Sequence, residues 1–485
     1  YAGIGDEYMK IETLKSNAPI ILYLAFYGIF SLIGITLYFS QNELYLLMYE
    51  RATGVSRPIL SIAEQKWNLF LITYIVPLIF VTAFYTMSKK LKMPTISRLL
   101  DNHLKYNQYV CLVLYLLVSS FVLYRIFSVI DLQDLFYAYT NYNVMIQTRF
   151  ILFDKLSRWD WLLIYSCIPT LTGLLYYKLQ SHYLKLIVLV LSSIILFYTM
   201  QKRYILLMFI FVYFVGLLQD KLVMRKVLMR SLYMVTALTF IFFVQTFLPV
   251  SYLLSNKDLK TNAMVDSPSV TTTTVPSNIG KQIKKTDLNA MNRKINTKLL
   301  FYTEKGTHVF FNFERNLYFF IGALINRTST PMVYFFELFP YQRDYLGNWL
   351  GCFLPHYHDD TALYEGNVVW KYTNGDMPGC LAAPFNFSLF ARVGVWGTLI
   401  ITLIYGLILG AFWAVIQSLK GAAHVLLTPM MYILMIYISM DNLVYSAFSS
   451  YGIFWWVFSF FFVCLASRLA MLISIQDHES ARKLT

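Results

Sequence analysis

Apolar and polar stretches alternate along this chain over distances much longer than the turn of a helix. About ten largely apolar runs, most of them near the ~20 residues that cross a hydrocarbon core, are separated by short polar segments. One polar interval, Ser251–Val395, is far longer than the others. This pattern predicts an all-α polytopic membrane protein. The runs expected to span the membrane are Ala18–Ser40, Trp67–Met87, Tyr109–Ile130, Trp161–Tyr177, Leu186–Met200, Tyr204–Leu218, Leu232–Val250, Trp396–Ile416, Val425–Met440 and Tyr451–Ile473.

The spans and the long interval divide the chain into three regions. Residues 1–250 form an N-terminal membrane region, residues 251–395 a large loop, and residues 396–485 a C-terminal membrane region. The fifth and sixth runs are short for a span, and only a few polar residues separate them. We expect two helices joined by a tight turn at Gln201-Lys202-Arg203, and the competing interpretation is one long kinked helix.

Basic residues predict the orientation. Cytoplasmic segments near membrane spans carry an excess of lysine and arginine. If the N-terminus is cytoplasmic, the inner segments hold most of the basic residues near the spans, and the C-terminus is cytoplasmic too. The large loop then faces outward. The richest inner segments contain Lys89, Lys90, Lys92, Arg98, Lys105, Lys221, Arg225, Lys226 and Arg230.

Composition agrees with a membrane protein and limits the partners. Of the 485 residues, 58% are hydrophobic and 14% are charged, whereas soluble domains carry roughly 25% charged residues. Much of the net charge of +14 lies in the inner basic segments, which are expected to contact anionic headgroups of membrane lipids. We expect no nucleic acid partner, because an outward loop meets none.

The large loop has two parts of different character. Ser251–Lys298 is polar and contains the run Thr271–Thr274, so it can bury little apolar surface. Leu299–Phe390 is rich in aromatic residues. Within it, Leu317–Ile325 and Met332–Phe339 are apolar but too short to span, and we expect them to lie at the interface or to re-enter the membrane.

Several arginines are candidates for binding an anionic substrate, because the guanidinium fork fits phosphate oxygens in pairs. Arg125, near the outer end of the third run, is either functional or extends to the interface. Arg343 has an acidic neighbour, Asp344, with which it could pair instead. The arginines expected to bind the phosphate groups of the substrate are Arg203, Arg327, Arg315 and Arg343.

A polar cluster follows in the same loop, in which imidazole and carboxylate groups are candidates for a general base. A solvated loop is the alternative interpretation. The spacing of the histidines would permit a metal, but no further ligand set completes a site, so we expect neither a metal nor another cofactor. The candidate bases are His356, His358, Asp359 and Glu365.

The cysteines divide by location. Cys111, Cys167 and Cys464 lie in predicted spans and are most simply small packing residues. Cys352 and Cys380 lie in the outward loop. There they either form a disulfide in an oxidising compartment or are buried thiols.

Several segments resemble the Wzy-type polymerases of O-antigen and common antigen. The similar features are a Lys-Arg turn after the fifth span, an arginine before a proline in the large loop, and a Phe/Pro turn. They are followed by a stretch that enters a glycine-containing span, although the family often has a few more spans than the ten found here. The segments concerned are Lys202-Arg203, Asn326–Pro331 with Arg327, Phe353-Leu354-Pro355, Asn374–Gly379, Ala383-Pro384-Phe385, Val393–Gly397, Gly406 and Gly410.

The resemblance implies a specific activity. It implies an inverting, metal-independent glycosyltransferase with a GT-C-like fold in a bacterial inner membrane. Such an enzyme polymerises polyprenyl-diphosphate-linked repeat units into a surface polysaccharide on the periplasmic face, and a chain-length regulator protein is a possible partner. Arginines would stabilise the diphosphate leaving group, and one of the candidate bases would activate the acceptor hydroxyl. A glycan ligase of the same superfamily and a non-enzymatic transporter of lipid-linked oligosaccharides are the alternatives.

Overall fold

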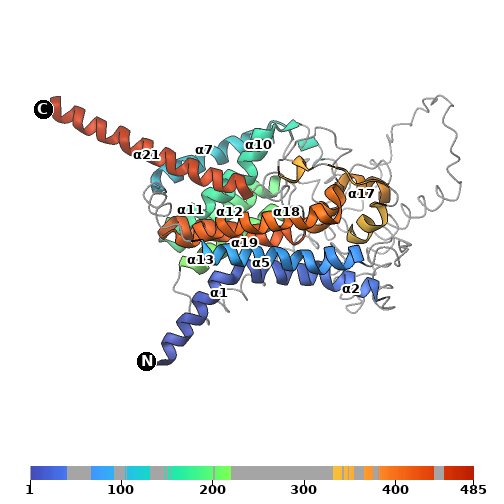
Figure 1. The fold of residues 1–485 in the computed structure, drawn as a ribbon. Coiled ribbons are helices and arrows are strands. Elements are labelled where there is room, and N and C mark those ends of the chain that lie inside the picture. The colour runs from blue at the N-terminus through green and yellow to red at the C-terminus, as the bar shows by residue number, and fades with distance from the viewer. Residues whose placement is uncertain are drawn as a thin grey trace, which may run out of the picture.

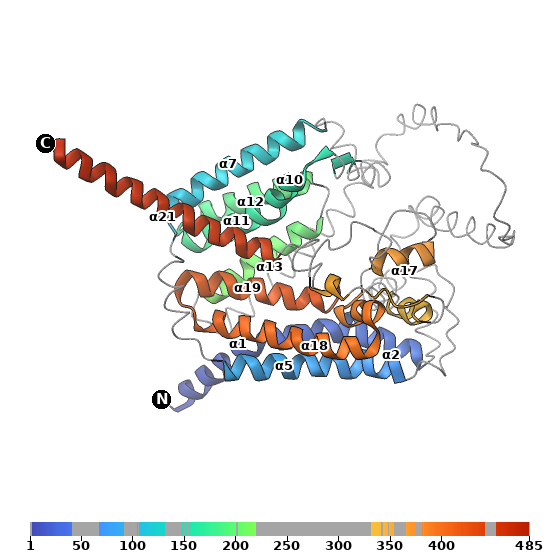
Figure 2. The ribbon, with the colours of Figure 1, turned by 45° about the horizontal axis from the view of Figure 1, so that its top comes forward.

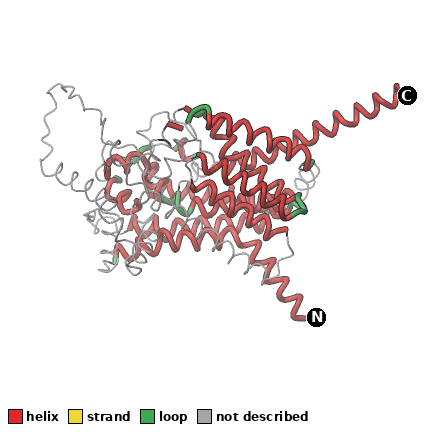
Figure 3. Tube along the Cα trace, turned by 180° about the vertical axis from the view of Figure 1, so that it is seen from behind, coloured by secondary structure: helices red, strands yellow, loops and turns green. Residues whose placement is uncertain are grey.

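The computed structural model of this chain is helical throughout the part that it describes. It describes residues 2–40, 67–91, 104, 106–130, 148, 151–152, 155–199, 202–219, 331–340, 343–347, 349–353, 365–374, 381, 383–441 and 453–484, without the side chains at 2–14, 202–203, 373–374 and 473–484. Within these residues there are helices and loops but no strand (Figure 3). The all-α prediction is therefore confirmed for the described part of the chain.

Helices occupy nearly all the runs that were predicted to span. The run Leu232–Val250 lies outside the described residues, so the predicted number of spans stays a prediction. The helical elements are α1 (Ala2–Tyr27), η1 (Gly28–Leu32), α2 (Ile33–Phe39), η2 (Leu71–Ile75), α5 (Val76–Lys90), α7 (Gln108–Phe127), α10 (Arg158–Leu162), η3 (Leu163–Cys167), α11 (Ile168–Lys178), α12 (His182–Tyr198), α13 (Lys202–Gln219), η6 (Leu350–Cys352), α17 (Glu365–Asn374), α18 (Phe385–Ser418), α19 (Gly421–Ile438) and α21 (Ile453–Leu484).

Length and hydropathy identify the membrane-spanning helices. Among the described residues, 6 helical segments are long and apolar enough to cross a membrane. Many of their apolar side chains face outward, as a lipid-facing surface requires; on α7, Leu116 is 52% and Leu117 62% exposed. The chain is thus a polytopic membrane protein. The segments are Lys15–Phe39, Trp67–Lys90, Gln108–Phe127, Phe385–Ser418, Gly421–Ile438 and Ile453–Leu472.

The two short apolar runs form separate helices. α12 ends at Tyr198 and α13 begins at Lys202, so the two runs are separate helices. Of the residues predicted to form the turn between them, Lys202 and Arg203 belong to the first turn of α13, and Gln201 lies outside the described residues. Both helices pack against α11. The ring of Tyr204 stacks on that of Tyr165 at 3.5 Å, and the Gln219 side chain donates to the Tyr177 carbonyl at 2.5 Å. α13 therefore runs parallel to α11, and the alternative of one long helix is not observed.

Two apolar helical segments contain a widened π-helical turn just before a proline. η2 precedes Pro77 and η3 precedes Pro169. Proline lacks an N–H group and its ring crowds the carbonyl one turn earlier. A turn with i→i+5 hydrogen bonds absorbs that crowding without ending the helix. Each proline is thus accommodated inside an apolar helix that continues for several more turns.

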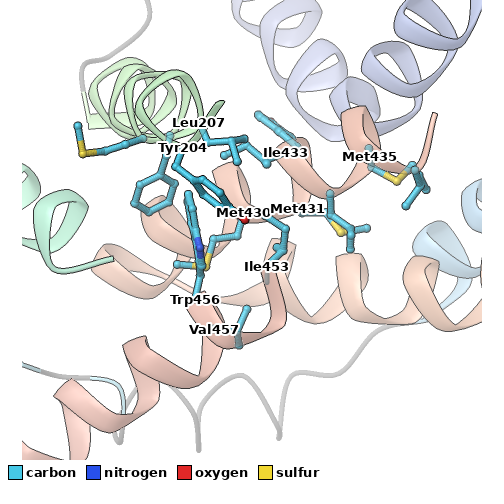
Figure 4. Packing of buried hydrophobic residues seen from close by; sticks show 14 of the residues in the cluster. Tyr204, Leu207, Met430, Met431, Ile433, Met435, Ile453, Trp456 and Val457 are labelled. Atoms are coloured by element: carbon cyan, nitrogen blue, oxygen red, sulfur yellow. The ribbon is translucent and has the colours of Figure 1, made fainter. Parts of the chain in front are cut away.

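α19 lies at the centre of the helical packing. It contacts α1, α13, α18 and α21. In its apolar stretch 83% of the residues are buried, whereas in that of α7 only 28% are. Figure 4 shows methionines of α19 packed beside Trp456 of α21 and Tyr204 of α13. Unbranched methionine side chains adapt to irregular gaps between aromatic rings. Its neighbours therefore bury α19 almost entirely.

α18 and α5 approach each other closely at two glycines. A Cβ built at Gly406 would lie 2.7 Å from the Phe80 carbonyl oxygen, and one built at Gly410 would lie 2.5 Å from that of Phe84. The spacing Gly-x-x-x-Gly puts both glycines on one helix face, where the absence of side chains lets two backbones meet. The two helices run parallel, because Asn386 near the start of α18 contacts Ile72 near the start of Trp67–Lys90, the span that contains α5.

The bundle has two distinct ends. Figures 1 and 2 both show the N- and C-termini at one end and α17 at the other. Hydrogen bonds from Lys89 and Gln417 to Ser16, at 2.5 and 3.0 Å, place the ends of α5 and α18 beside the early part of α1. Both termini therefore lie on the side opposite α17, as the predicted topology requires. The cytoplasmic assignment of that side stays a prediction.

We expect Gly410→Ala to destabilise the protein, because its methyl group would overlap the Phe84 carbonyl; overpacking of this kind costs about 1–3 kcal/mol. Gly28→Ala is the matched control, since a Cβ there would meet nothing within 4 Å. Thermal unfolding of both variants in detergent, followed by size-exclusion chromatography, measures the difference. Equal unfolding midpoints would show that the two backbones can separate at little cost.

The orientation is testable with two engineered cysteines at opposite ends of the bundle. Lys371 on α17 and Lys90 at the end of α5 are both exposed. A membrane-impermeant maleimide added to spheroplasts should label Lys371→Cys, and it should label Lys90→Cys only after the membrane is permeabilised. The reverse pattern would invert the predicted topology. Unmodified protein gives the background from native thiols.

Candidate functional site

Several short segments gather at the end of the bundle opposite the termini, and we call them the cap. It consists of residues 331–340, 343–347 and 349–353, α17 and residues 383–393. Phe336 packs against Phe390 at 4.9 Å. The backbone N–H groups of Leu346 and Gly347 donate to the carbonyls of Ala391 and Arg392 at 3.0 and 2.8 Å. The run Met332–Phe339, expected at the interface, is largely helical and belongs to this cap.

A break at Gly394 separates the cap from the membrane span of α18. Its φ of 68° lies in the left-handed region, where a side chain is strained. A Cβ at this position would also lie 3.0 Å from the Tyr345 ring. Residues before the break belong to the cap, and residues after it form the span that packs on α5. The bend at this glycine therefore allows one continuous segment to form part of the cap and then the membrane span.

Glu365 and Arg392 form a buried ion pair at the centre of the cap. The Arg392 Nε and Nη2 atoms both lie 2.7 Å from Glu365 Oε2. The Ser388 hydroxyl donates to the other carboxylate oxygen. The side chains of the arginine and the glutamate are only 7% and 2% exposed. A buried charge is tolerated when a partner and hydrogen bonds satisfy it, as here.

The same arginine reaches a third segment. Arg392 Nη1 donates to the Gly351 carbonyl, and the Tyr405 hydroxyl on the span donates to the carbonyl of Cys352. Burial raises the pKa of the Cys352 thiol to about 12. Cys352 is a buried thiol, which agrees with the second of the two alternatives for the loop cysteines. Cys380 lies outside the described residues.

Asn386 anchors the cap to the first two spans. Its side-chain Nδ2 donates to the Tyr27 hydroxyl at 3.1 Å and to the Ile72 carbonyl at 2.7 Å. The Tyr27 hydroxyl in turn donates to the Thr73 carbonyl at 2.8 Å. Both carbonyls belong to η2. A buried amide with two partners thus fixes the start of α18 against the membrane helices.

The predicted role of Glu365 as a base is not favoured by this geometry. Both carboxylate oxygens are occupied by Arg392 and Ser388, and the residue is 1% exposed. A general base must reach the proton that it removes. Glu365 therefore has the environment of a group that positions the cap. Neither Arg392 nor Ser388 was predicted from the sequence. The signal that could have identified Arg392 is its position as a charged residue within an apolar stretch.

Of the four predicted diphosphate-binding arginines, Arg343 is the one whose side chain the structure describes. It is exposed, its backbone N–H donates to the Leu338 carbonyl at 3.0 Å, and it forms no ion pair with its neighbour Asp344. Arg203 lies in the first turn of α13. Arg315, Arg327, His356, His358 and Asp359 lie outside the described residues, so their roles stay predictions.

A carboxylate that sequence reasoning missed lies close to Arg343 in the chain. Glu337 in the helix 331–338 accepts a hydrogen bond from the Tyr372 hydroxyl of α17 at 2.7 Å. Its second oxygen, Oε2, is buried and has no hydrogen-bond partner among the described residues. Burial raises the pKa of Glu337, and the Tyr372 hydrogen bond lowers it in part. Glu337 was not predicted as a site residue, because it is a single charged residue within the apolar run Met332–Phe339.

Arg125 has a partner elsewhere at this end of the bundle. Its Nη2 lies 3.0 Å from Asp160 Oδ2, and Asp160 also closes a capping box with Ser157 at the start of α10. The arginine joins α7 to α10. Arg125 was expected either to be functional or to extend to the interface. An ion pair within the bundle was not predicted. Among the described residues, no group of three His, Cys, Asp or Glu side chains is arranged to hold a metal.

Glu365→Gln should destabilise the protein, because it leaves the Arg392 guanidinium buried without a counter-charge. Breaking a buried pair in this way costs about 3–5 kcal/mol. Replacing both partners, as Glu365→Gln with Arg392→Met, should be less damaging than the single change. Unfolding midpoints of the two single variants and the double variant test this. Additive losses would mean that the pair is not coupled.

Comparison of the chain with protein-family models, with curated proteins and with solved structures finds no match. The resemblance to Wzy-type polymerases therefore rests on the sequence segments named above, and it stays a prediction.

Proposed function

We propose that this chain is a membrane glycosyltransferase that polymerises polyprenyl-diphosphate-linked repeat units. The observation that carries the proposal is the exposed Arg343, without an ion pair to Asp344, within a folded cap at one end of a membrane bundle. An arginine held near a membrane surface suits a lipid diphosphate, whose oxygens accept paired hydrogen bonds. The remaining predicted arginines, Arg203, Arg315 and Arg327, would complete the site.

The chemistry needs little more than charge and position. The sugar leaves a lipid diphosphate, so negative charge grows on the departing phosphate oxygen. Fixed donors aimed at that charge are usually the largest source of rate enhancement in such a site. The rigid cap provides fixed positions, because the Glu365–Arg392 pair joins its segments. In this proposal the enzyme is inverting and metal-independent, with a GT-C-like arrangement of helices.

The proposed location follows from the orientation prediction. The cap faces the periplasm of a bacterial inner membrane, both termini are cytoplasmic, and the partners are lipid-linked glycans, membrane lipids and a chain-length regulator. The product is a surface polysaccharide such as O-antigen, common antigen or capsule.

Deletion of the gene in its own host tests the proposal. A polymerase deletion should abolish long polysaccharide and accumulate lipid-linked single repeat units on the outer face, seen by mass spectrometry and by access to an added periplasmic glycosidase. Loss of a transporter would accumulate the same lipid on the inner face, out of reach of the glycosidase. Loss of a ligase would leave long polymer attached to the polyprenyl lipid. Either of these last two results contradicts the proposal.

Arg343→Ala should shorten the polymer severely while leaving protein abundance unchanged. Losing one charge-assisted contact to the leaving group lowers the rate roughly a hundredfold. Arg343→Lys should recover activity only in part, because it keeps the charge but loses the planar fork. Arg158→Ala removes an exposed arginine of α10 and serves as the control. Polymer of normal length from the Arg343→Ala variant would assign the diphosphate to other residues.

A further inference from the structure

We propose that Glu337 is the general base that activates the acceptor sugar, and that Tyr372 positions it. The inference rests on the proposed function and names a catalytic group within it. Glu337 and Tyr372 come from separate segments of the cap and meet through one hydrogen bond of 2.7 Å. Neither takes part in the Glu365–Arg392 pair that holds the cap together.

The geometry of Glu337 leaves one oxygen available for a ligand. Tyr372 occupies Oε1, whereas Oε2 is buried and no group in the described part of the chain donates to it. A buried acceptor without a donor costs free energy in the resting protein, and native structures rarely keep one without a reason. A substrate hydroxyl that donates to Oε2 supplies the missing partner. Glu337 as a residue is half-buried rather than fully enclosed, so Oε2 must become accessible when the acceptor binds.

The environment also tunes this carboxylate for proton transfer. A general base works best when its pKa approaches the pH at which the enzyme operates. Burial moves the pKa of Glu337 in that direction, and the Tyr372 hydrogen bond moves it partly back. The same combination of an apolar surrounding and a single donor distinguishes carboxylates that exchange protons from those locked in ion pairs.

Aromatic rings beside the carboxylate suit a sugar. Tyr372 is 39% exposed as a residue, and its ring lies 6.5 Å from that of the buried Tyr334 in a T-shaped arrangement. A tyrosine presents an apolar face together with a polar edge, and a sugar ring has apolar C–H faces and hydroxyl edges. The ligand class expected here is therefore the neutral terminal sugar of the acceptor repeat unit.

The step balances without any further reactant. The acceptor hydroxyl gives its proton to Glu337 Oε2 while its oxygen forms a bond to the anomeric carbon of the donor. The bond between that carbon and the diphosphate oxygen breaks, and the electron pair leaves with the polyprenyl diphosphate. Arg343, whose backbone is bonded to the carbonyl of Leu338, follows Glu337 closely in the chain and offers a positive charge for the leaving group.

Few of the described residues of the cap are charged. The described elements of the cap carry Lys371 and Tyr372 on α17, Arg343 and Asp344 on the following segment, and the Glu365–Arg392 pair. Of these, only Tyr372 is identified as a cause of the shift in the Glu337 pKa. Changing Tyr372 is therefore the most direct way to move the titration of Glu337.

The experiment uses purified full-length protein and lipid-linked repeat units extracted from the deletion strain. Glu337→Gln should lower kcat by about 10²–10⁴-fold, the usual contribution of a general base, with an unchanged unfolding midpoint. In Tyr372→Phe, loss of the hydrogen bond raises the Glu337 pKa, so more of the carboxyl is protonated at a given pH. Activity should therefore be lost at a higher pH on the acid side than in the unmodified enzyme. Asp344→Asn, which removes an exposed carboxylate of the cap, is the control.

The outcomes separate this inference from the proposed function. If the unmodified protein does not elongate the lipid-linked units, the proposed function fails. If it does, and Glu337→Gln stays within a few-fold of its kcat, the inference is overturned. An inactive Glu337→Gln together with an unmoved acid limb in Tyr372→Phe also overturns it, because a purely structural carboxylate would behave in that way.

Discussion

The cap depends on one buried interaction, the ion pair between Glu365 and Arg392. Two opposite charges at this depth are stable only together, since each would be costly to bury alone. The arginine also holds the Gly351 carbonyl, and the glutamate holds Ser388. Three segments that are distant in sequence are thereby fixed against one another. The described part of the cap therefore has a defined centre, from which its candidate side chains project.

The membrane helices give that centre a fixed place. Asn386 connects the start of α18 to η2, and the glycines at 406 and 410 bring the rest of α18 onto α5. Since α19 is enclosed by its neighbours, the bundle offers little room for one helix to slide past another. The cap and its candidate residues are therefore attached to a rigid support, which is the condition that electrostatic catalysis requires.

The sequence predicted the helices better than the site, for a physical reason. Spanning runs are set by local hydrophobicity, so Trp67–Met87 and Val425–Met440 were recognisable at once. The role of Glu365 was not, because its partner Arg392 lies beyond a polar segment and nothing local indicates that the two meet. Glu337 was missed for the opposite reason: an apolar run hides its single charge. Arg343 was predicted to be a candidate and is exposed, but its role stays a prediction, because no local pattern encodes what an exposed arginine binds.

The break at Gly394 has a consequence for how this protein tolerates insertions and deletions. Arg392 is fixed by the cap, and Gly406 is fixed by contact with α5. Each residue of a helix turns the chain by about 100° and advances it by about 1.5 Å. One residue added between these two points would turn the glycine face away from α5, or twist the arginine away from its carboxylate. The number of residues in this short stretch is therefore more tightly constrained than the identity of most of them.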